Sequence, residues 1–156
     1  MRPAEVRIYF DADILGLGKV IAALRSGCTY PGDQGRVIHK RERPPCSVTS
    51  PDIDDTVWIR QVTSEGLLII TRDSKIQRRA GELLAVQEHR ARMVALASPD
   101  ARTVWDQLEI FMRQWRAIEQ LHSLDGPFIY RASRTTLSKV GLPSDRRAAR
   151  RGGTTG

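Results

Sequence analysis

The chain has few cysteines, few aromatic residues and no long apolar run. Cys28 and Cys46 stand far apart, with no Cys or His pair near them at zinc-ligand spacing, so the sequence indicates neither a disulfide framework nor a zinc site. No apolar run approaches the ~20 residues that span a bilayer, and the first residues lack a signal-peptide core. We therefore expect a protein that is neither membrane-bound nor secreted, and the cytoplasm is its expected location.

What is present fits one domain with an excess of positive charge. The 156 residues, 40% of them apolar, suffice for a single core. The net charge is +7, which indicates a polyanionic or acidic partner. Residues 131–156 hold seven basic residues and one acid, so nearly all of that excess lies there. We expect a folded domain over residues 1–140 and a basic, disordered tail over 141–156.

Strand-like and helix-like segments alternate along the predicted domain. Periodicity, caps and breakers predict strands at 6–10, 36–39, 67–71, 93–97 and 128–131, the last at a sheet edge, and helices at 14–24, 54–64, 76–89 and from Asp100 onward. Three prolines make residues 41–51 a predicted loop. This order predicts an α/β fold, a three-layer α/β/α domain with a mostly parallel central sheet, whose ligands bind beyond the carboxyl ends of the strands.

Acidic residues follow the predicted strands at that edge. Asp11 and Asp13 come directly after residues 6–10, and Asp73 follows the apolar strand 67–71. Asp54 and Asp55 begin the next clear helix, where an N-cap explains Asp54 better than a ligand role does. Carboxylates gathered in one crevice repel one another unless a cation compensates, and hard oxygen ligands suit Mg²⁺ or Mn²⁺. With basic surroundings, the expected substrate is a phosphodiester.

Three segments in this order resemble the PIN-like nuclease superfamily, with its VapC-toxin-related branch as the nearest likeness. They are residues 8–13 (IYFDAD), 55–59 (DTVWI) and 69–73 (IITRD). The resemblance covers about residues 5–97, and its most specific part is the apolar strand that ends in Thr-Arg-Asp.

The resemblance implies a metal-dependent ribonuclease, the toxin of a toxin–antitoxin pair. It implies that Asp11, Asp55 and Asp73 are catalytic ligands of Mg²⁺ or Mn²⁺, with Asp13 as a fourth ligand. Its expected partners are RNA, an antitoxin protein and a second copy of the chain. One departure is that no further acid follows the strand at 93–97 except Asp100, which can serve merely as a helix cap.

Basic residues beside Asp73 are candidate RNA contacts. Arg72 precedes it, while Lys75 and Arg79 share one face at helical spacing. Such side chains can hold phosphates near the metal. A solvated helix face explains them equally well.

Other interpretations account for parts of the pattern. Asp11-Ala12-Asp13 also resembles the nucleophile motif of haloacid-dehalogenase-like phosphatases, but the acidic pair Asp54-Asp55 precedes Thr71 instead of following it. A degenerate PIN-like module that only binds RNA or protein needs no carboxylates, which repel phosphate. On the predicted long helix, the large side chains either pack in the core, which we favour, or form in part an exposed docking stripe; they are Trp105, Phe111, Met112 and Trp115.

Overall fold

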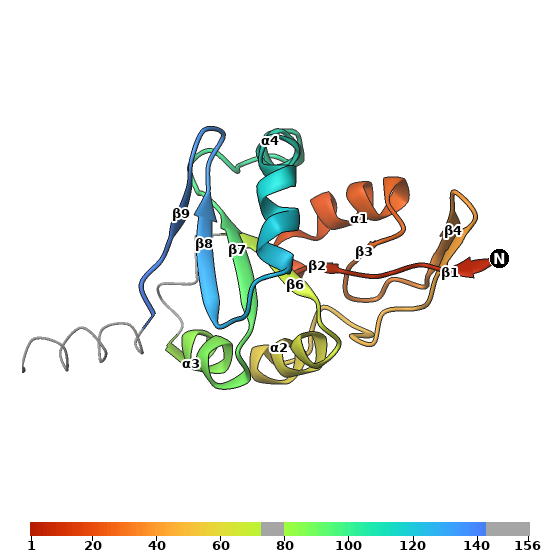
Figure 1. Ribbon diagram of the computed structural model, residues 1–156, viewed down its shortest axis with the longest axis horizontal. Helices are drawn as coiled ribbons and strands as arrows, with labels where there is room; N and C mark the ends of the chain where they lie inside the picture. Colours follow the sequence, from red (N-terminus) through yellow and green to blue (C-terminus); the bar gives the residue numbers. More distant parts are fainter. Residues whose placement is uncertain (73–79, 143–156) are drawn as a thin grey trace, which may run out of the picture.

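A mostly parallel sheet forms the centre of the protein. The computed structural model describes residues 1–72 and 80–142 (Figure 1). Among them, six strands form one sheet in the order β3 (Cys28–Thr29), β2 (Ile8–Phe10), β6 (Leu68–Arg72), β7 (Arg92–Leu96), β8 (Phe128–Ala132) and β9 (Leu137–Lys139). Every neighbouring pair is parallel except β8 and β9, which are antiparallel.

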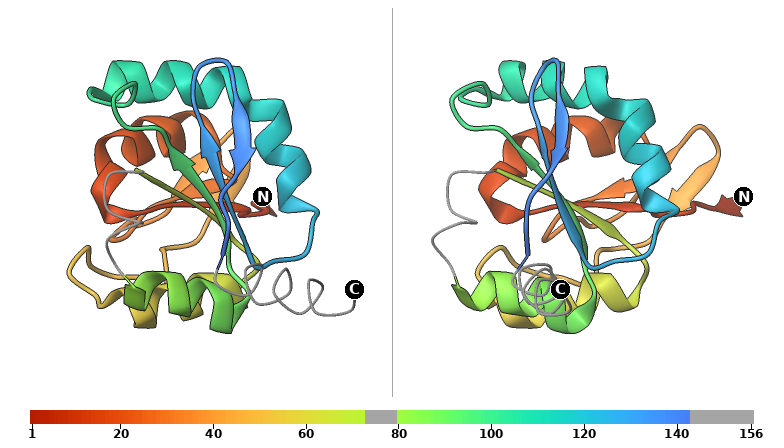
Figure 2. Two further views of the ribbon diagram at one scale, coloured as in Figure 1. Left: turned by 90° about the vertical axis from the view of Figure 1, so that its left-hand side faces the viewer. Right: turned by 60° about the vertical axis from the view of Figure 1, so that its left-hand side comes forward.

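Helices cover both faces of this sheet, as Figure 2 shows. A 3₁₀ helix, η1 (Ala12–Ile14), leads into α1 (Leu15–Leu24), which shares one face with α4 (Val104–His122); α2 (Asp55–Ser64) and α3 (Ala80–His89) cover the other. Residues alternate between the two faces along β2, because Ile8 and Phe10 pack in the α1–α4 core and Tyr9 packs in the other. The predicted three-layer α/β/α fold is confirmed.

Three local predictions were wrong. The strand at 128–131 is not at the edge, because β9 pairs along its outer side. The predicted loop at 41–51 contains β5 (Arg41–Arg43), since its prolines begin only at Pro44, after the strand has ended. Asp100 does not cap α4. The N-cap of this helix is Thr103, whose side chain accepts a hydrogen bond from the Asp106 amide.

A small second sheet projects from the body and is called the β-arm here. It consists of β1 (Arg2–Pro3), β5 and β4 (Arg36–Ile38), in that order. A buried ion pair ties it to the body, because Arg43 Nε donates to Asp33 Oδ2 at 2.7 Å and Arg43 Nη1 donates to the Ala22 carbonyl at 2.9 Å.

The large side chains of α4 divide between core and surface. Phe111 is buried and Trp115 packs partly against the same core, which confirms core packing for these two. Trp105 and Met112 are 77% and 63% exposed, so part of the helix does present an apolar stripe. Among the helices of the described residues, none combines the length and the apolar character needed to cross a membrane.

The described chain ends inside the predicted tail. Leu142 is buried against the α2–α3 core. Residues 143–156, which make up most of the basic tail, lie outside the described residues, and the boundary at residue 140 stays a prediction.

Candidate functional site

Strand register brings Asp11 and Thr71 side by side. Phe10 of β2 pairs with Ile70 of β6, and the Asp11 amide donates to the Ile70 carbonyl at 2.9 Å. The next residue of each strand therefore lies at the same carboxyl edge. There the Thr71 hydroxyl oxygen is 3.2 Å from Asp11 Oδ2 and 2.8 Å from Asp13 Oδ2, so one hydroxyl links two carboxyl groups.

The start of η1 holds these two carboxyl groups. Asp11 is the N-cap of η1, and its Oδ1 accepts a hydrogen bond from the Ala12 amide at 2.6 Å. Asp13 lies in the first turn, and both of its carboxylate oxygens accept from the Arg72 amide at 3.3 Å. Asp11 is only 8% exposed, while Asp13 is open to solvent. The edge thus combines a buried acid with an accessible one.

Asp55 approaches from α2 in an orientation fixed by its own helix. Asp54 caps α2 by accepting from the Thr56 amide at 3.0 Å, which confirms its predicted cap role. Asp55 Oδ1 accepts from the Trp58 indole Nε1 at 2.8 Å, three residues later. The Trp58 ring stacks on Tyr9 of β2, with 5.3 Å between centroids. The tryptophan therefore joins the Asp55 carboxylate to the sheet.

Glu82 of α3 is the residue that the sequence analysis missed. Its side chain is 5% exposed, and its charge acts on Asp11, as does that of Asp55. The available signal was an acid beside the apolar run Leu83–Val86 in a helix that covers the sheet. A buried carboxylate is costly unless something compensates its charge.

Burial and neighbouring acids keep a proton on Asp11. Loss of solvent raises the pKa of Asp11 to about 8, and the charges of Asp13, Glu82 and Asp55 act in the same direction. The same surroundings raise the pKa of the Tyr9 hydroxyl. At neutral pH without a cation, a protonated Asp11 can donate to Thr71, whose hydroxyl donates in turn to Asp13. A cation would replace that proton.

The stability of the metal-free protein should fall as pH rises from about 4 to about 8. The folded protein keeps the Asp11 proton up to its raised pKa, whereas the unfolded chain releases it near the ordinary value of 3.8. Between these values folding requires proton uptake, which costs at most about 1.4 kcal/mol per pH unit. The measurement is the melting temperature of the wild type and of Asp11→Asn in EDTA as a function of pH. The melting temperature of the wild type should fall relative to that of the variant as pH rises. If the two melting temperatures change in parallel with pH over this range, the raised pKa of Asp11 is contradicted.

The described residues complete only part of the predicted site. No group of three or more His, Cys, Asp or Glu side chains in residues 1–72 and 80–142 is assembled to hold a metal ion. Asp73, Lys75 and Arg79 lie outside the described residues, and their roles stay predictions. Arg72 is half-buried, and its Nε finds no hydrogen-bond partner within the described chain.

The donor chemistry that is present suits a hard cation. Four carboxyl groups are available: Asp11 at the end of β2, Asp13 in η1, Asp55 in α2 and Glu82 in α3. Oxygen donors with mutual repulsion favour Mg²⁺ or Mn²⁺ over softer metals. Asp100 is engaged elsewhere, in a 3.4 Å ion pair with Arg134.

One comparison with known proteins identifies a family for this chain. A family model described as a PIN like domain matches residues 6–98, more than half of the chain. No curated protein and no solved structure matches. The matched segment contains all four carboxyl groups.

Proposed function

Because the chain belongs to the PIN-like domain family, whose members are generally nucleases, we propose that it is a metal-dependent endoribonuclease. One observation carries this proposal. Asp11 and Asp13 share the Thr71 hydroxyl at the carboxyl edge of β2 and β6, so a buried and an exposed carboxyl group lie together where the strands end. A protein that only bound RNA would gain nothing from these acids, because they repel phosphate.

The carboxyl groups supply the ligand set in this proposal. Asp11, Asp13, Asp55 and Glu82 would hold Mg²⁺ or Mn²⁺, together with Asp73. The ion, when bound, neutralises charge on the scissile phosphate and lowers the pKa of an attacking water. Asp11 must give up its proton for this, so metal affinity should rise with pH up to about 8.

Other residues orient the ligands and the substrate. The Thr71 hydroxyl and the Arg72 amide fix Asp13, and the Trp58 indole fixes Asp55. Such partners set ligand orientation and commonly contribute a factor of about 10 to 100 in metal affinity or activity. We propose Arg72, Lys75 and Arg79 as contacts to RNA phosphates near the metal.

The biological role we propose is that of a cytoplasmic VapC-like toxin. The resemblance of residues 8–13, 55–59 and 69–73 to that branch supports it. An antitoxin or a second copy of the chain would then need an apolar docking surface. Trp105 and Met112 on α4, which are both exposed, would contribute to it in this proposal.

The test is cleavage of labelled RNA by identically purified proteins with Mg²⁺ and with EDTA. Glu82→Gln removes a buried charge near Asp11, and Glu88→Gln is its control at an exposed position on the same helix. We expect Mg²⁺-dependent fragments from the wild type and from Glu88→Gln, and at least a tenfold loss in Glu82→Gln, as for a lost ligand or ligand-orienting group. Asp73→Asn tests the remaining ligand in the same assay.

If the protein binds RNA but cleaves it neither with Mg²⁺ nor with EDTA, the proposal is contradicted. It would favour the alternative, a non-catalytic binding module with a PIN-like fold. Cleavage that persists in EDTA would instead point to a contaminating nuclease or to metal-free chemistry.

A further inference from the structure

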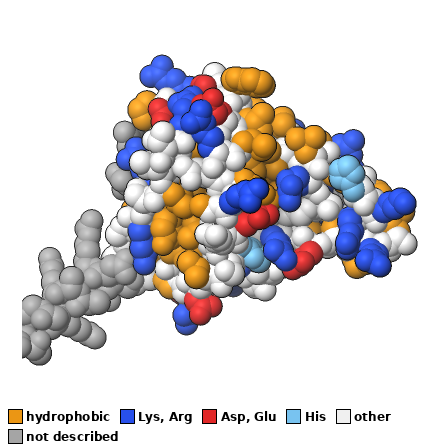
Figure 3. Space-filling model, turned by 45° about the horizontal axis from the view of Figure 1, so that its top comes forward, with side chains coloured by type: hydrophobic (Ala, Val, Ile, Leu, Met, Phe, Trp, Pro, Cys, Tyr) orange, Lys and Arg blue, Asp and Glu red, His pale blue; other side chains and the backbone are white. Residues whose placement is uncertain are grey.

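The β-arm carries a concentration of exposed positive charge. Its exposed basic residues are Arg2, Arg36, Lys40 and Arg41, and its strands contribute one exposed acid, Glu42. In Figure 3 the Lys and Arg side chains gather at the right of the molecule, where the β-arm lies. None of these residues belongs to the acidic edge described above.

Strand register turns the arginines to one side. Arg2 and Ile38 are both paired with Arg41, and Arg36 is paired with Arg43. Paired residues share a face of the sheet. On this face Ile38 and Arg43 are buried, while Arg2, Arg36 and Arg41 stay exposed. Glu42 pairs with Val37 and Pro3 and therefore lies on the opposite face.

The positive charge on that face is not compensated within the described chain. Like charges directly opposite one another destabilise a sheet, and here Arg2 stands beside Arg41 and Arg36 beside Arg43. Asp33 compensates Arg43 alone, since the other basic residues of the β-arm form no ion pair among residues 1–72 and 80–142. An external anion would supply the missing charge.

The turn at the tip places a further cation there. His39 and Lys40 connect β4 and β5 with φ values of 49° and 62°. Such two-residue turns favour Asn and Gly, because side chains rarely adopt positive φ. The tip of the β-arm therefore carries a histidine and a lysine at positions where Asn and Gly would be less strained.

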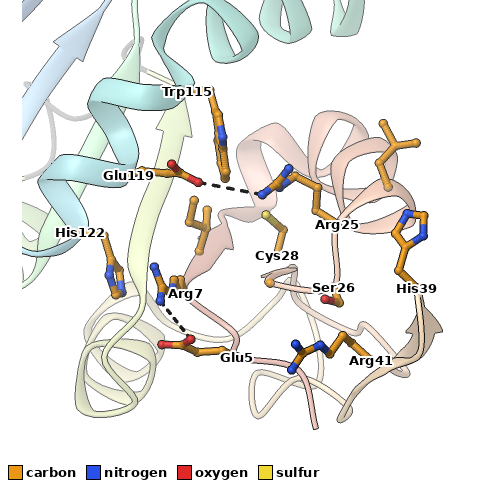
Figure 4. Close-up of a pocket in the computed structure, with 13 residues that line it drawn as sticks. Glu5, Arg7, Arg25, Ser26, Cys28, His39, Arg41, Trp115, Glu119 and His122 are labelled. Atoms are coloured by element: carbon orange, nitrogen blue, oxygen red, sulfur yellow. Dashed lines mark ion pairs between the residues drawn. The ribbon is translucent and has the colours of Figure 1, made fainter. Parts of the chain in front are cut away.

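A cavity continues the basic surface from the β-arm onto the body. It has a volume of about 430 Å³ and is lined by His39 and Arg41 of the β-arm and by Arg7 and Arg25 of the body (Figure 4). The Arg25 guanidinium lies 4.3 Å from the centroid of the Trp115 ring.

The two acids in the cavity leave it with net positive charge. Glu5 pairs with Arg7 at 3.0 Å, and Glu119 reaches Arg25 only at 3.9 Å. Arg41 has no acidic partner in the described chain. The cavity lies near Ile8 and Cys28, which begin β2 and β3, so it is at the opposite edge of the sheet from Asp11.

We propose that the β-arm and this cavity form a second binding surface for RNA, which holds its phosphate backbone away from the acidic edge. The inference rests on the proposed function only in naming RNA as the polyanion. Exposed guanidinium and ammonium groups suit sequence-independent contacts to phosphates. The arginine-bearing face of the β-arm presents no exposed large apolar side chain that would anchor an acidic protein segment, since Val37 lies on the other face. The cavity beside it does include the exposed Leu24, so an acidic peptide is the competing ligand in the test.

The test measures binding without cleavage. Fluorescence anisotropy of a labelled RNA of about 30 nucleotides is recorded in EDTA over a range of salt concentrations. The triple variant Arg36→Gln, Lys40→Gln, Arg41→Gln removes three β-arm charges. The control triple Arg60→Gln, Arg113→Gln, Arg116→Gln removes three exposed charges from α2 and α4. Thermal melts confirm that both variants fold.

We expect the β-arm triple to bind about tenfold or more weakly near 0.1 M salt, with a salt slope lower by about two, since each lost contact to single-stranded RNA contributes about 0.7. The control triple should change both quantities much less. Equal weakening in the two triples, or none in the β-arm triple, would overturn the proposal. So would tighter β-arm-dependent binding of an acidic peptide than of RNA.

A separate measurement distinguishes this proposal from the enzymatic one. Cleavage of the same RNA by the wild type with Mg²⁺ tests whether the acidic edge is catalytic. If the β-arm triple weakens RNA binding but the wild type does not cleave RNA, the second RNA surface is supported and the ribonuclease is refuted. If the wild type cleaves RNA but the β-arm triple binds it as well as the wild type does, the second surface is refuted and the ribonuclease is supported.

Discussion

Asp11→Asn is expected to abolish metal-dependent RNA cleavage while leaving a stable fold. The substitution removes the one carboxyl group that is both buried and in contact with Thr71 at the strand edge. Loss of a metal ligand forfeits several kcal/mol of transition-state stabilisation, which corresponds to a loss in rate of roughly 10²- to 10³-fold. The asparagine side chain has the same shape and keeps one oxygen as an acceptor for the Ala12 amide, while its amide nitrogen lies beside the Thr71 hydroxyl and can donate to it.

The measurement is the initial rate of Mg²⁺-dependent cleavage, with melting temperature as the check on folding. Asp54→Asn is the matched control, because asparagine caps a helix as well as aspartate does and Asp54 only caps α2. The control should keep wild-type activity. If Asp11→Asn folds and cleaves at the wild-type rate in a nuclease-free preparation, then the acidic edge is not the catalytic centre.

Arg43→Met is expected to cause the largest loss of stability of the substitutions considered. Arg43 and Asp33 are 2% and 3% exposed, and the ion pair between them is 2.7 Å long. Asp33 also accepts from the Thr29 hydroxyl at 2.8 Å and from the Gly35 amide at 2.9 Å. Removing the arginine leaves a buried carboxylate without its counter-ion, which costs about 3–5 kcal/mol.

Thermal or urea denaturation measures this cost, and a loss of that size lowers the melting temperature of a chain of this length by roughly 6–20 °C. Arg60→Met, at an exposed position on α2, should lose less than 0.5 kcal/mol, as surface substitutions do. The double variant Asp33→Asn, Arg43→Met should lose less than the sum of its single variants, since the two residues are in contact. A small loss in Arg43→Met alone would show that this pair does not anchor the β-arm.

The sequence predicted those parts of the fold that depend on local patterns. The apolar run 67–71 indicated a strand buried in a parallel sheet, residues 93–97 indicated a further strand, and helical spacing indicated the helices between them. Gly66, with φ of 78°, ends α2 where a stop was expected. Strand ends also located Asp11 and Asp13, because parallel strands present their carboxyl ends at one edge.

The tertiary structure decided which distant residues meet. Glu82 gave little signal, since only the packing of α3 against the sheet brings its charge near Asp11. The bond from Thr71 to both acids depends on the pairing of Phe10 with Ile70, a register that neither strand encodes alone. β9 was missed because its three residues are a strand only by pairing with β8.

The β-arm illustrates both what the sequence determines and what only the tertiary structure decides. The sequence by itself determined that this protein is a basic α/β domain with acids at its strand ends, because composition and periodicity are local properties of the chain. Its arginines near residues 36–43 were visible there only as charges next to prolines. Only the pairing of β1, β5 and β4 sets three of them on one face and buries Arg43 against Asp33, because register and burial are fixed by contacts between residues far apart in the sequence.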